Sequence, residues 1–285
     1  MNGALVIALT AALPIFNFVS SIILIMLALK LGARVATLQA GAAAAFIAVA
    51  SLIGGSSAGI VVFLLALNWA PALLLAAVLL MTRSLVLTAQ VSVIVAITMM
   101  LAFYAIVTDV EGLWLELIDL LMQVWRDAGQ DNLAAAVEQQ KAIIAQYATP
   151  FSVAAAWMVQ AGSLVLGYLL YRQLPEETID FGRFRDLNFG RVLAVSLAVI
   201  SVAGTLLNVI WLQGIAFVLL AAFWLQGVAI GHWLHAEKLM HVSGVVAMYV
   251  LMLLFARFVI PALAVIGYID AWFGFRRRIA AKRQG

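Results

Sequence analysis

Residues 242–268 read VSGVVAMYVLMLLFARFVIPALAVIGY, and this stretch decides the fold class. It is longer than the roughly 18 apolar residues that mark a membrane-spanning helix. Arg257 is its one charged residue. Comparable stretches recur along the chain, so the sequence predicts an all-α, polytopic bundle of transmembrane helices.

Eight spans are predicted, near residues 3–29, 35–53, 57–81, 85–107, 151–172, 191–210, 213–235 and 242–268. Hydrophobic residues make up 66% of the 285 residues and charged residues 10%, which excludes an ordinary soluble domain. We therefore treat residues 1–285 as a single integral membrane domain. Pro14, Pro71 and Pro261 lie inside three of the spans, and we expect those helices to be kinked or broken there.

Several classes of function find no support in the sequence. The chain has no cysteine, which excludes disulfides, thiolate metal sites and iron–sulfur clusters. No HExxH, GxSxG or P-loop pattern is present, so we expect neither an enzyme nor a cofactor. His232 and His235 share a helical face but lack further ligands, so we also expect no metal site. The net charge of +3 is spread over loops and the C-terminus, which fits membrane lipid as a partner better than nucleic acid.

Residues 109–149 differ from the apolar spans. From Val110 to Ala128 the polar residues recur every three or four positions, as in a helix lying in the membrane interface. Gly129 would end this helix, and Asp131 or Asn132 could cap a second one running to about Tyr147. We predict an interfacial, amphipathic hairpin, with a plain connecting hairpin as an equal alternative.

The basic residues predict an orientation that the C-terminus contradicts. With eight spans, one side holds the loops that carry Lys30, Arg34, Arg83, Arg172, Arg183, Arg185, Arg191 and Lys238, and the positive-inside rule makes that side cytoplasmic. The basic tail at 276–285 then falls on the other side. Either one segment, most plausibly a proline-containing one, does not cross, or the tail is an exception; we give the early loops more weight.

Arg257 is the best candidate for a site. A charged group at that depth costs roughly 2.5–3.5 kcal/mol, so we expect Arg257 to be buried against a polar partner from another helix. The alternative is a helix broken at Pro261 that leaves Arg257 near water. The other candidates for a ligand-binding or buried polar cluster are Asn17, Asn68, Gln160, Asn208, Tyr249 and His232.

Small residues recur every four positions in two spans. One stripe consists of Ala4, Ala8 and Ala12, and the other of Ala36, Ala40, Ala44 and Ala48. Such stripes allow helix backbones to approach closely. They favour packing within the bundle, and the alternative is an interface with another membrane subunit or a second copy of the chain.

Four stretches of the chain follow a pattern known from other proteins: ALTAALPIFNFVSSIILIMLALKLGAR at 8–34, PEETIDFGRFRDLNFGRVLA at 175–194, GVAIGHWLH at 227–235 and GYIDAWFGFRRR at 267–278, together with Tyr249 and Pro261. In these stretches the chain resembles the uncharacterised bacterial YybS-like membrane-protein family. The resemblance implies a multi-pass protein of the bacterial cytoplasmic (inner) membrane. It also implies an architecture similar to the S components of energy-coupling-factor transporters, in which an alanine stripe like Ala4, Ala8 and Ala12 docks the coupling subunit. S components usually have six spans, fewer than are predicted here.

Two functions follow as hypotheses. The first is a transport-type membrane protein that binds a small solute or lipid-derived ligand between its helices, and the alternative is a non-catalytic envelope scaffold. A transporter needs a polar cavity containing Arg257, whereas a scaffold should be packed solid there. We expect the basic tail to be a surface anchor in which Asp270 pairs with one of Arg276 to Arg278.

Overall fold

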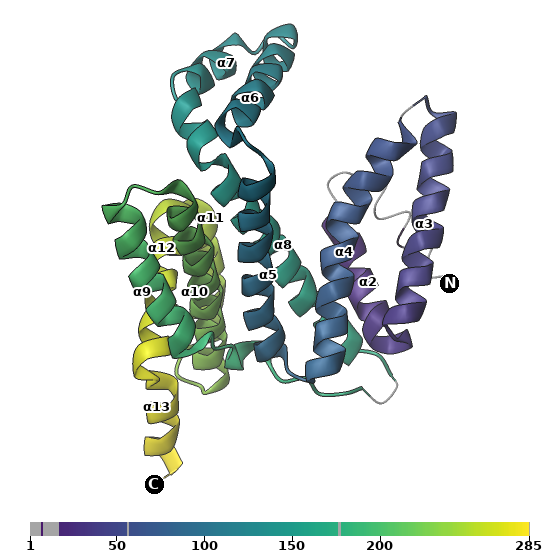
Figure 1. Cartoon of the computed structure of the whole chain (residues 1–285). Coiled ribbons are helices and arrows are strands. Elements are labelled where there is room, and N and C mark those ends of the chain that lie inside the picture. The colour runs from purple at the N-terminus through teal and green to yellow at the C-terminus, as the bar shows by residue number, and fades with distance from the viewer. Residues whose placement is uncertain (1–6, 8–16, 56, 176–177, 285) are drawn as a thin grey trace. The chain divides into compact units, whose positions relative to one another are not determined.

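The computed structural model describes Ile7 and residues 17–55, 57–175 and 178–284 of the chain (Figure 1). Over these residues the chain forms twelve α-helices and one 3₁₀ turn, and no strand. Six helices are long and apolar enough to cross a membrane, and three more are apolar but shorter. The protein is therefore an all-α, multi-pass membrane protein, as predicted. Its helices, which we expected in a single bundle, group into two compact units.

The first unit comprises residues up to Ser92 and residues 157–187. It contains α2 (Asn17–Leu31), α3 (Ala33–Ile53), α4 (Ala58–Thr82), the start of α5 (Leu85–Ile106), the end of α8 (Lys141–Arg172) and the 3₁₀ turn η2 (Phe184–Asp186). Its apolar core joins α2, α3, α4 and α8 around Leu24, Trp69, Leu79 and Tyr168.

The alanine stripe on α3 serves this core. Ala36, Ala40 and Ala43 are buried within the unit, and Ala44 and Ala48 are half-buried. For α3, the structure therefore agrees with the prediction that the stripe packs against other helices of the same chain. The stripe of Ala4, Ala8 and Ala12 lies outside the described residues, so its role stays a prediction.

The second unit comprises residues 93–156 and 188–285. Besides the remaining parts of α5 and α8, its helices are α6 (Val110–Asp127), α7 (Asp131–Glu138), α9 (Gly190–Leu206), α10 (Ile210–Ala236), α11 (Val242–Leu254), α12 (Ala256–Phe273) and α13 (Phe275–Gln284). The central helix is α10, which has the largest buried share of the six candidate spans.

Two glycines let α10 and α12 touch backbone to backbone. A Cβ at Gly267 would overlap the carbonyl oxygen of Phe223, and a Cβ at Gly227 would overlap that of Leu263. Small residues allow this approach in membranes, where hydrophobicity does not hold helices together. The crossing fixes α12, and with it the C-terminal segment, against α10.

The stretch 242–268 does not form the single span that we predicted. Helix α11 ends at Leu254 and α12 begins at Ala256, and Phe255 between them has a non-helical backbone conformation (φ −130°, ψ 39°). The break lies six residues before Pro261, whose missing N–H removes the partner of the Arg257 carbonyl and weakens the helix just upstream. Of the kink or break expected at Pro71 and Pro261, the break does not occur, because α4 and α12 continue through these prolines. Pro14 lies outside the described residues.

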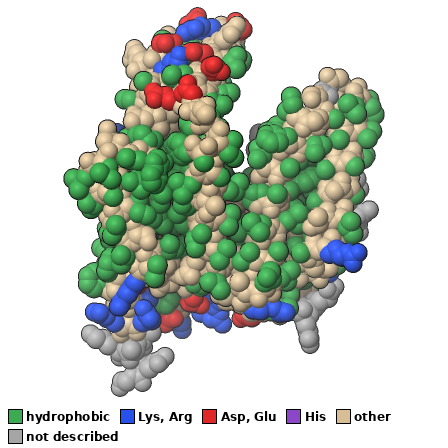
Figure 2. All heavy atoms as spheres, viewed as in Figure 1, with side chains coloured by type: hydrophobic (Ala, Val, Ile, Leu, Met, Phe, Trp, Pro, Cys, Tyr) green, Lys and Arg blue, Asp and Glu red, His purple; other side chains and the backbone are tan. Residues whose placement is uncertain are grey.

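The segment 109–149 forms a hairpin whose first helix is α6, as predicted. Asp109 caps this helix by accepting a hydrogen bond from Gly112 N (2.8 Å), and Gly129, with φ of 73°, turns the chain. The predicted extent of the second helix was wrong. Helix α7 ends at Glu138, and a new helix, α8, begins at Lys141 and runs past Tyr147. Charged side chains gather at the tip of the hairpin (Figure 2).

Candidate functional site

Arg257 is not buried, which contradicts our prediction. It is exposed in the first turn of α12, directly after the break at Phe255, and makes no hydrogen bond or ion pair with any residue that the structure describes. The break places this residue near a helix end, from which a long guanidinium side chain reaches the surface. The expected polar cavity around Arg257 is therefore absent from the described part of the chain.

Two of the other candidates meet in the first unit. The Nε2 atom of Gln160, on α8, donates to both the main-chain oxygen and Oδ1 of Asn68 on α4, each at 3.0 Å. Next to this pair, Trp69 Nε1 donates to Ser20 Oγ at 2.8 Å. These bonds join α2, α4 and α8 through polar groups inside an apolar core, the usual role of amides in membrane helices.

The Asn68–Gln160 pair leaves acceptor capacity unused. Gln160 is 9% exposed and Ser163, one turn further along α8, is 2% exposed. Gln160 Oε1 and Ser163 Oγ are both buried, and neither has a hydrogen-bond partner among the residues that the structure describes. Buried polar atoms of this kind usually bind water or another small polar group.

The remaining candidates do not join this cluster. His232 Nε2 and the Tyr249 hydroxyl are 2.8 Å apart and link α10 to α11. Asn208 lies in the turn between α9 and α10 with φ of 52°, and not inside a span as predicted. Asn is one of the residues that tolerate this conformation. Asn17 begins α2, but its side chain is outside the described part of the structure.

Histidines do not form a metal site in the described residues, where no group of three His, Asp or Glu side chains lies close enough to hold an ion. His235 Nδ1 is 3.2 Å from the main-chain oxygen of Met240, and His241 Nδ1 is 3.1 Å from Ser243 Oγ. Each of these two histidines therefore contacts a residue close to it in the sequence, and the two contacts are separate.

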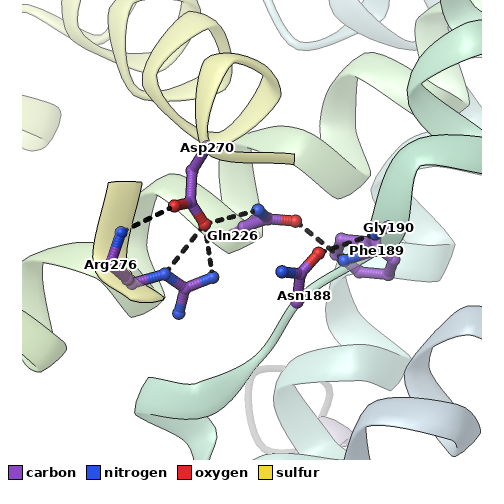
Figure 3. Close-up of polar contacts among 6 residues, drawn as sticks. All are labelled: Asn188, Phe189, Gly190, Gln226, Asp270 and Arg276. Atoms are coloured by element: carbon purple, nitrogen blue, oxygen red, sulfur yellow. Dashed lines mark hydrogen bonds and ion pairs between the residues drawn. The ribbon is translucent and has the colours of Figure 1, made fainter. Parts of the chain in front are cut away.

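A buried polar network joins four elements of the second unit (Figure 3). Asp270 Oδ2, on α12, accepts hydrogen bonds from Arg276 Nε at 2.8 Å and Gln226 Nε2 at 3.1 Å, and its ion pair with Arg276 Nη2 measures 2.6 Å. Gln226 Oε1 in turn accepts from Phe189 N at 2.8 Å, just before α9. The predicted pairing of Asp270 with one of the tail arginines is confirmed.

This network holds the C-terminal helix in place. Asp270 is 1% exposed and Arg276 7%, so both charges have left water. Asp270 and Gln226 use all their side-chain polar atoms within the network. A buried charge pair is tolerated when its lone pairs and protons are satisfied in this way. Because every polar side-chain atom of these two residues has a partner inside the network, a structural role is favoured over ligand binding.

A second polar cluster shapes the loop after α8 in the first unit. The Tyr168 hydroxyl donates to Asp180 Oδ1 and accepts from Phe181 N, both at 2.9 Å, and Gly182 N donates to the same carboxylate at 2.9 Å. These bonds, first the one from the Gly182 amide and then the one from the Tyr168 hydroxyl, lower the pKa of Asp180.

An open groove lies between α9, α10 and α12 of the second unit, with a volume of about 390 Å³. Its lining is mostly apolar, with three polar side chains, and consists of Leu197, Ala198, Ser201, Gln213, Ala216, Phe217, Leu220, Val265 and Tyr268. The volume falls in the range of roughly 300–1,000 Å³ that is typical of ligand pockets.

The groove is polar at the end where α9 meets α10. There Gln213 Nε2 donates to the Gly204 carbonyl at 3.1 Å, and Gln213 Oε1 accepts from the Tyr147 hydroxyl at 3.2 Å. Toward the middle of the helices the lining becomes mostly apolar, through Phe217 and Leu220 of α10 and Leu197 of α9, and Tyr268 of α12 is the polar residue there. Such a gradient suits an amphiphile whose polar end lies near Gln213.

Sequence reasoning missed the groove residues Ser201, Gln213 and Tyr268. They are separated along the chain, and only the packing of three helices brings them together. The available signal was weak: Ala198 and Ala216 are small residues on consecutive spans, which leave room where two helices meet.

Comparison with known proteins gives no match to this chain among protein-family models, curated proteins or solved structures.

Proposed function

We propose that the chain is a membrane protein of the transport type that binds a small, lipid-derived amphiphile in the groove between α9, α10 and α12. The observation that carries this proposal is the groove itself, an open recess of about 390 Å³ with three polar side chains in an apolar lining. Ligand sites in proteins commonly combine a mainly apolar wall with a few placed polar groups.

The class of ligand follows from the surroundings. Leu220 and Val265, which line the groove, are also exposed on the outer surface of the helices. In a multi-pass membrane protein that surface faces lipid, so a ligand can enter sideways from the bilayer. An acyl or isoprenoid chain would lie along Phe217 and Leu220, with a hydrogen-bonding head group near Gln213 and Ser201.

The transport part of the proposal rests on the resemblance to S-component-like membrane proteins, and Arg257 does not contribute to it. The sequence has no nucleotide-binding motif, so active transport would need a partner subunit. The alternative, a scaffold in the envelope, is favoured by the exposed apolar face of α6.

The test is photo-crosslinking of the full chain in nanodiscs with phosphatidylcholine that carries a diazirine on one acyl chain. We expect adducts on the groove peptides, above the level on the lipid-exposed surface of α4. Ala216→Phe, which fills the groove, should lower the groove adducts about fivefold or more, because overpacking removes the space for the chain.

Val199→Phe is the matched control, because Val199 is an exposed residue of α9 that does not line the groove. It should leave the adducts unchanged. Groove labelling no stronger than that on α4, or equal in both variants, would rule out the binding site.

A further inference from the structure

Helix α6 carries two apolar faces, and the described residues of the second unit cover only one of them. Ile118 and Met122 are buried against Ala134 of α7 and Ala145 of α8. The other face is exposed and consists of large residues three or four positions apart, namely Leu113, Leu117, Leu120, Leu121 and Val124, which we call the α6 stripe. These positions share one side of a helix.

The hairpin that carries the α6 stripe is held in one conformation by contacts between its own side chains. Trp114 Nε1 donates to Thr149 Oγ1 at 2.7 Å, which ties α6 to α8. Lys141 pairs with Asp119 at 2.6 Å, and Arg126 with Glu138 at 3.3 Å. A surface that is ordered before binding loses less conformational entropy when a partner docks.

The charge of the hairpin indicates which kind of partner can bind to the α6 stripe. Between Asp109 and Lys141 the sequence has seven acidic and two basic residues, and the ion pairs above use both basic ones. Glu116 and Asp127 make no ion pair with a described residue, and both are exposed. Glu116 is one turn before Leu120 and Asp127 is three residues after Val124, so both flank the α6 stripe.

This acidic border disfavours two occupants. An anionic lipid surface attracts basic side chains by about 1 kcal/mol each, and by the same physics it repels acidic ones. A second copy of the chain would bring the same acidic border against its own. An apolar stripe beside unpaired carboxylates is instead complementary to a helix with an apolar face and a basic border.

We propose that the α6 stripe is the docking surface for a cationic amphipathic helix of a partner protein. The leucine side chains form the apolar contact, and Glu116 and Asp127 pair with lysine or arginine on the partner. This inference is independent of the groove between α9, α10 and α12.

The experiment places the photo-crosslinking residue p-benzoylphenylalanine at Leu120 of the full chain in its native membrane. Leu120 is 60% exposed in the centre of the α6 stripe. We expect a protein adduct whose cross-linked peptide, mapped by mass spectrometry, is a helix with basic residues beside an apolar face. The same probe at Glu111, which is exposed on the side of α6 opposite Leu120, should give much less of this adduct.

Charge reversal makes the test specific. Glu116→Lys combined with Asp127→Lys should reduce the Leu120 adduct about tenfold, because like charges then meet across the contact. Glu111→Lys combined with Asp131→Lys changes the net charge equally but away from the α6 stripe, and should leave the adduct largely intact.

Four outcomes would overturn the proposal. They are adducts with lipid only, adducts with a second copy of this chain, a cross-linked peptide without basic residues, and no adduct at all. An equal loss of adduct in both charge-reversal variants would also overturn it, because the effect would then come from net charge and not from the α6 stripe.

Discussion

At the scale of single residues, Asp270 and Arg276 show how this protein keeps a charge pair away from water. Transfer of either ion alone into a buried site is unfavourable by several kcal/mol, and only close pairing with further hydrogen bonds compensates. Gln226 donates such a bond to Asp270 and accepts another from Phe189 N. Besides its own helices, α12 and α13, the pair therefore depends on two further elements, α10 and the start of α9.

Replacing Asp270 with Asn should lower the free energy of unfolding by about 3–5 kcal/mol, because the Arg276 charge is then buried without its counterion. Denaturation of the purified protein in mixed micelles measures this change. Adding Arg276→Gln to Asp270→Asn should recover part of the loss, since the double variant buries no charge. Asp127→Asn, at an exposed position, should change stability by no more than about 0.5 kcal/mol. A double variant less stable than Asp270→Asn would contradict the account.

The loop after α8 should loosen in acid. The pKa of Asp180 in the folded chain lies below its ordinary value of 3.8, so its contribution to stability is complete well above pH 3.8 and is lost as the pH falls below that value. Hydrogen-exchange protection of the Phe181 and Gly182 amides should therefore decrease in this range. Asp180→Asn should remove most of the pH dependence; an unchanged profile in that variant would show that another group controls the loop.

The sequence predicted some of these residues and not others, for physical reasons. The Asp270–Arg276 pair was predictable because both lie near one helix end, six residues apart. The predicted burial of Arg257 was wrong because residues 242–268 do not form an unbroken span. The meeting of Asn68 with Gln160 depends on the packing of α4 against α8, which the pattern of a single helix does not determine.

At the scale of elements, the contact of α10 with α12 depends on glycine. Gly227 and Gly267 bring the two backbones so close that no side chain fits between them. This contact also aligns Gln226 with Asp270, so the helix crossing and the buried network support each other.

Gly267→Ala should destabilise the second unit by about 1–3 kcal/mol, because the added methyl group meets a backbone carbonyl that is not free to move. Gly162→Ala on α8 is the matched control, since a Cβ there has no neighbour within 4 Å. That change should be neutral or slightly stabilising, as alanine has the higher helix propensity. Thermal unfolding of both variants in detergent compares them; equal midpoints would mean that the crossing has room to relax.

Most spans were predicted to within a few residues, because apolar length is a strong signal. Helices α3, α4 and α5 match their predicted ranges closely. The division of 242–268 was missed, since Phe255 is as apolar as its neighbours and hydropathy does not register a backbone turn. The extension of α8 through Pro150 was also missed, because an amphipathic and an apolar segment share one helix there.

At the scale of the second unit as a whole, the ends of the helices differ in charge. The network connects the C-terminal segment, through Asp270 and Gln226, to Phe189 at the end where α9 begins (Figure 3). The acidic hairpin lies toward the other end, where Tyr147 contacts Gln213 in the first turn of α10. With eight spans, the basic tail would lie on the side opposite the basic loops. The break at Phe255 removes this conflict, because it lets the chain return to the basic end.

The positive-inside rule then predicts that the basic end of the second unit is cytoplasmic. Because the chain has no cysteine, single substitutions report this directly. Arg191→Cys and Arg278→Cys should react with a membrane-impermeant maleimide from the cytoplasmic side, and Asp131→Cys in the hairpin from the opposite side. All three should react in permeabilised membranes, which controls for access to the thiol. Labelling of Arg278→Cys and Asp131→Cys from one side would show that the tail and the hairpin share a compartment, and the break at Phe255 would then not account for the position of the tail.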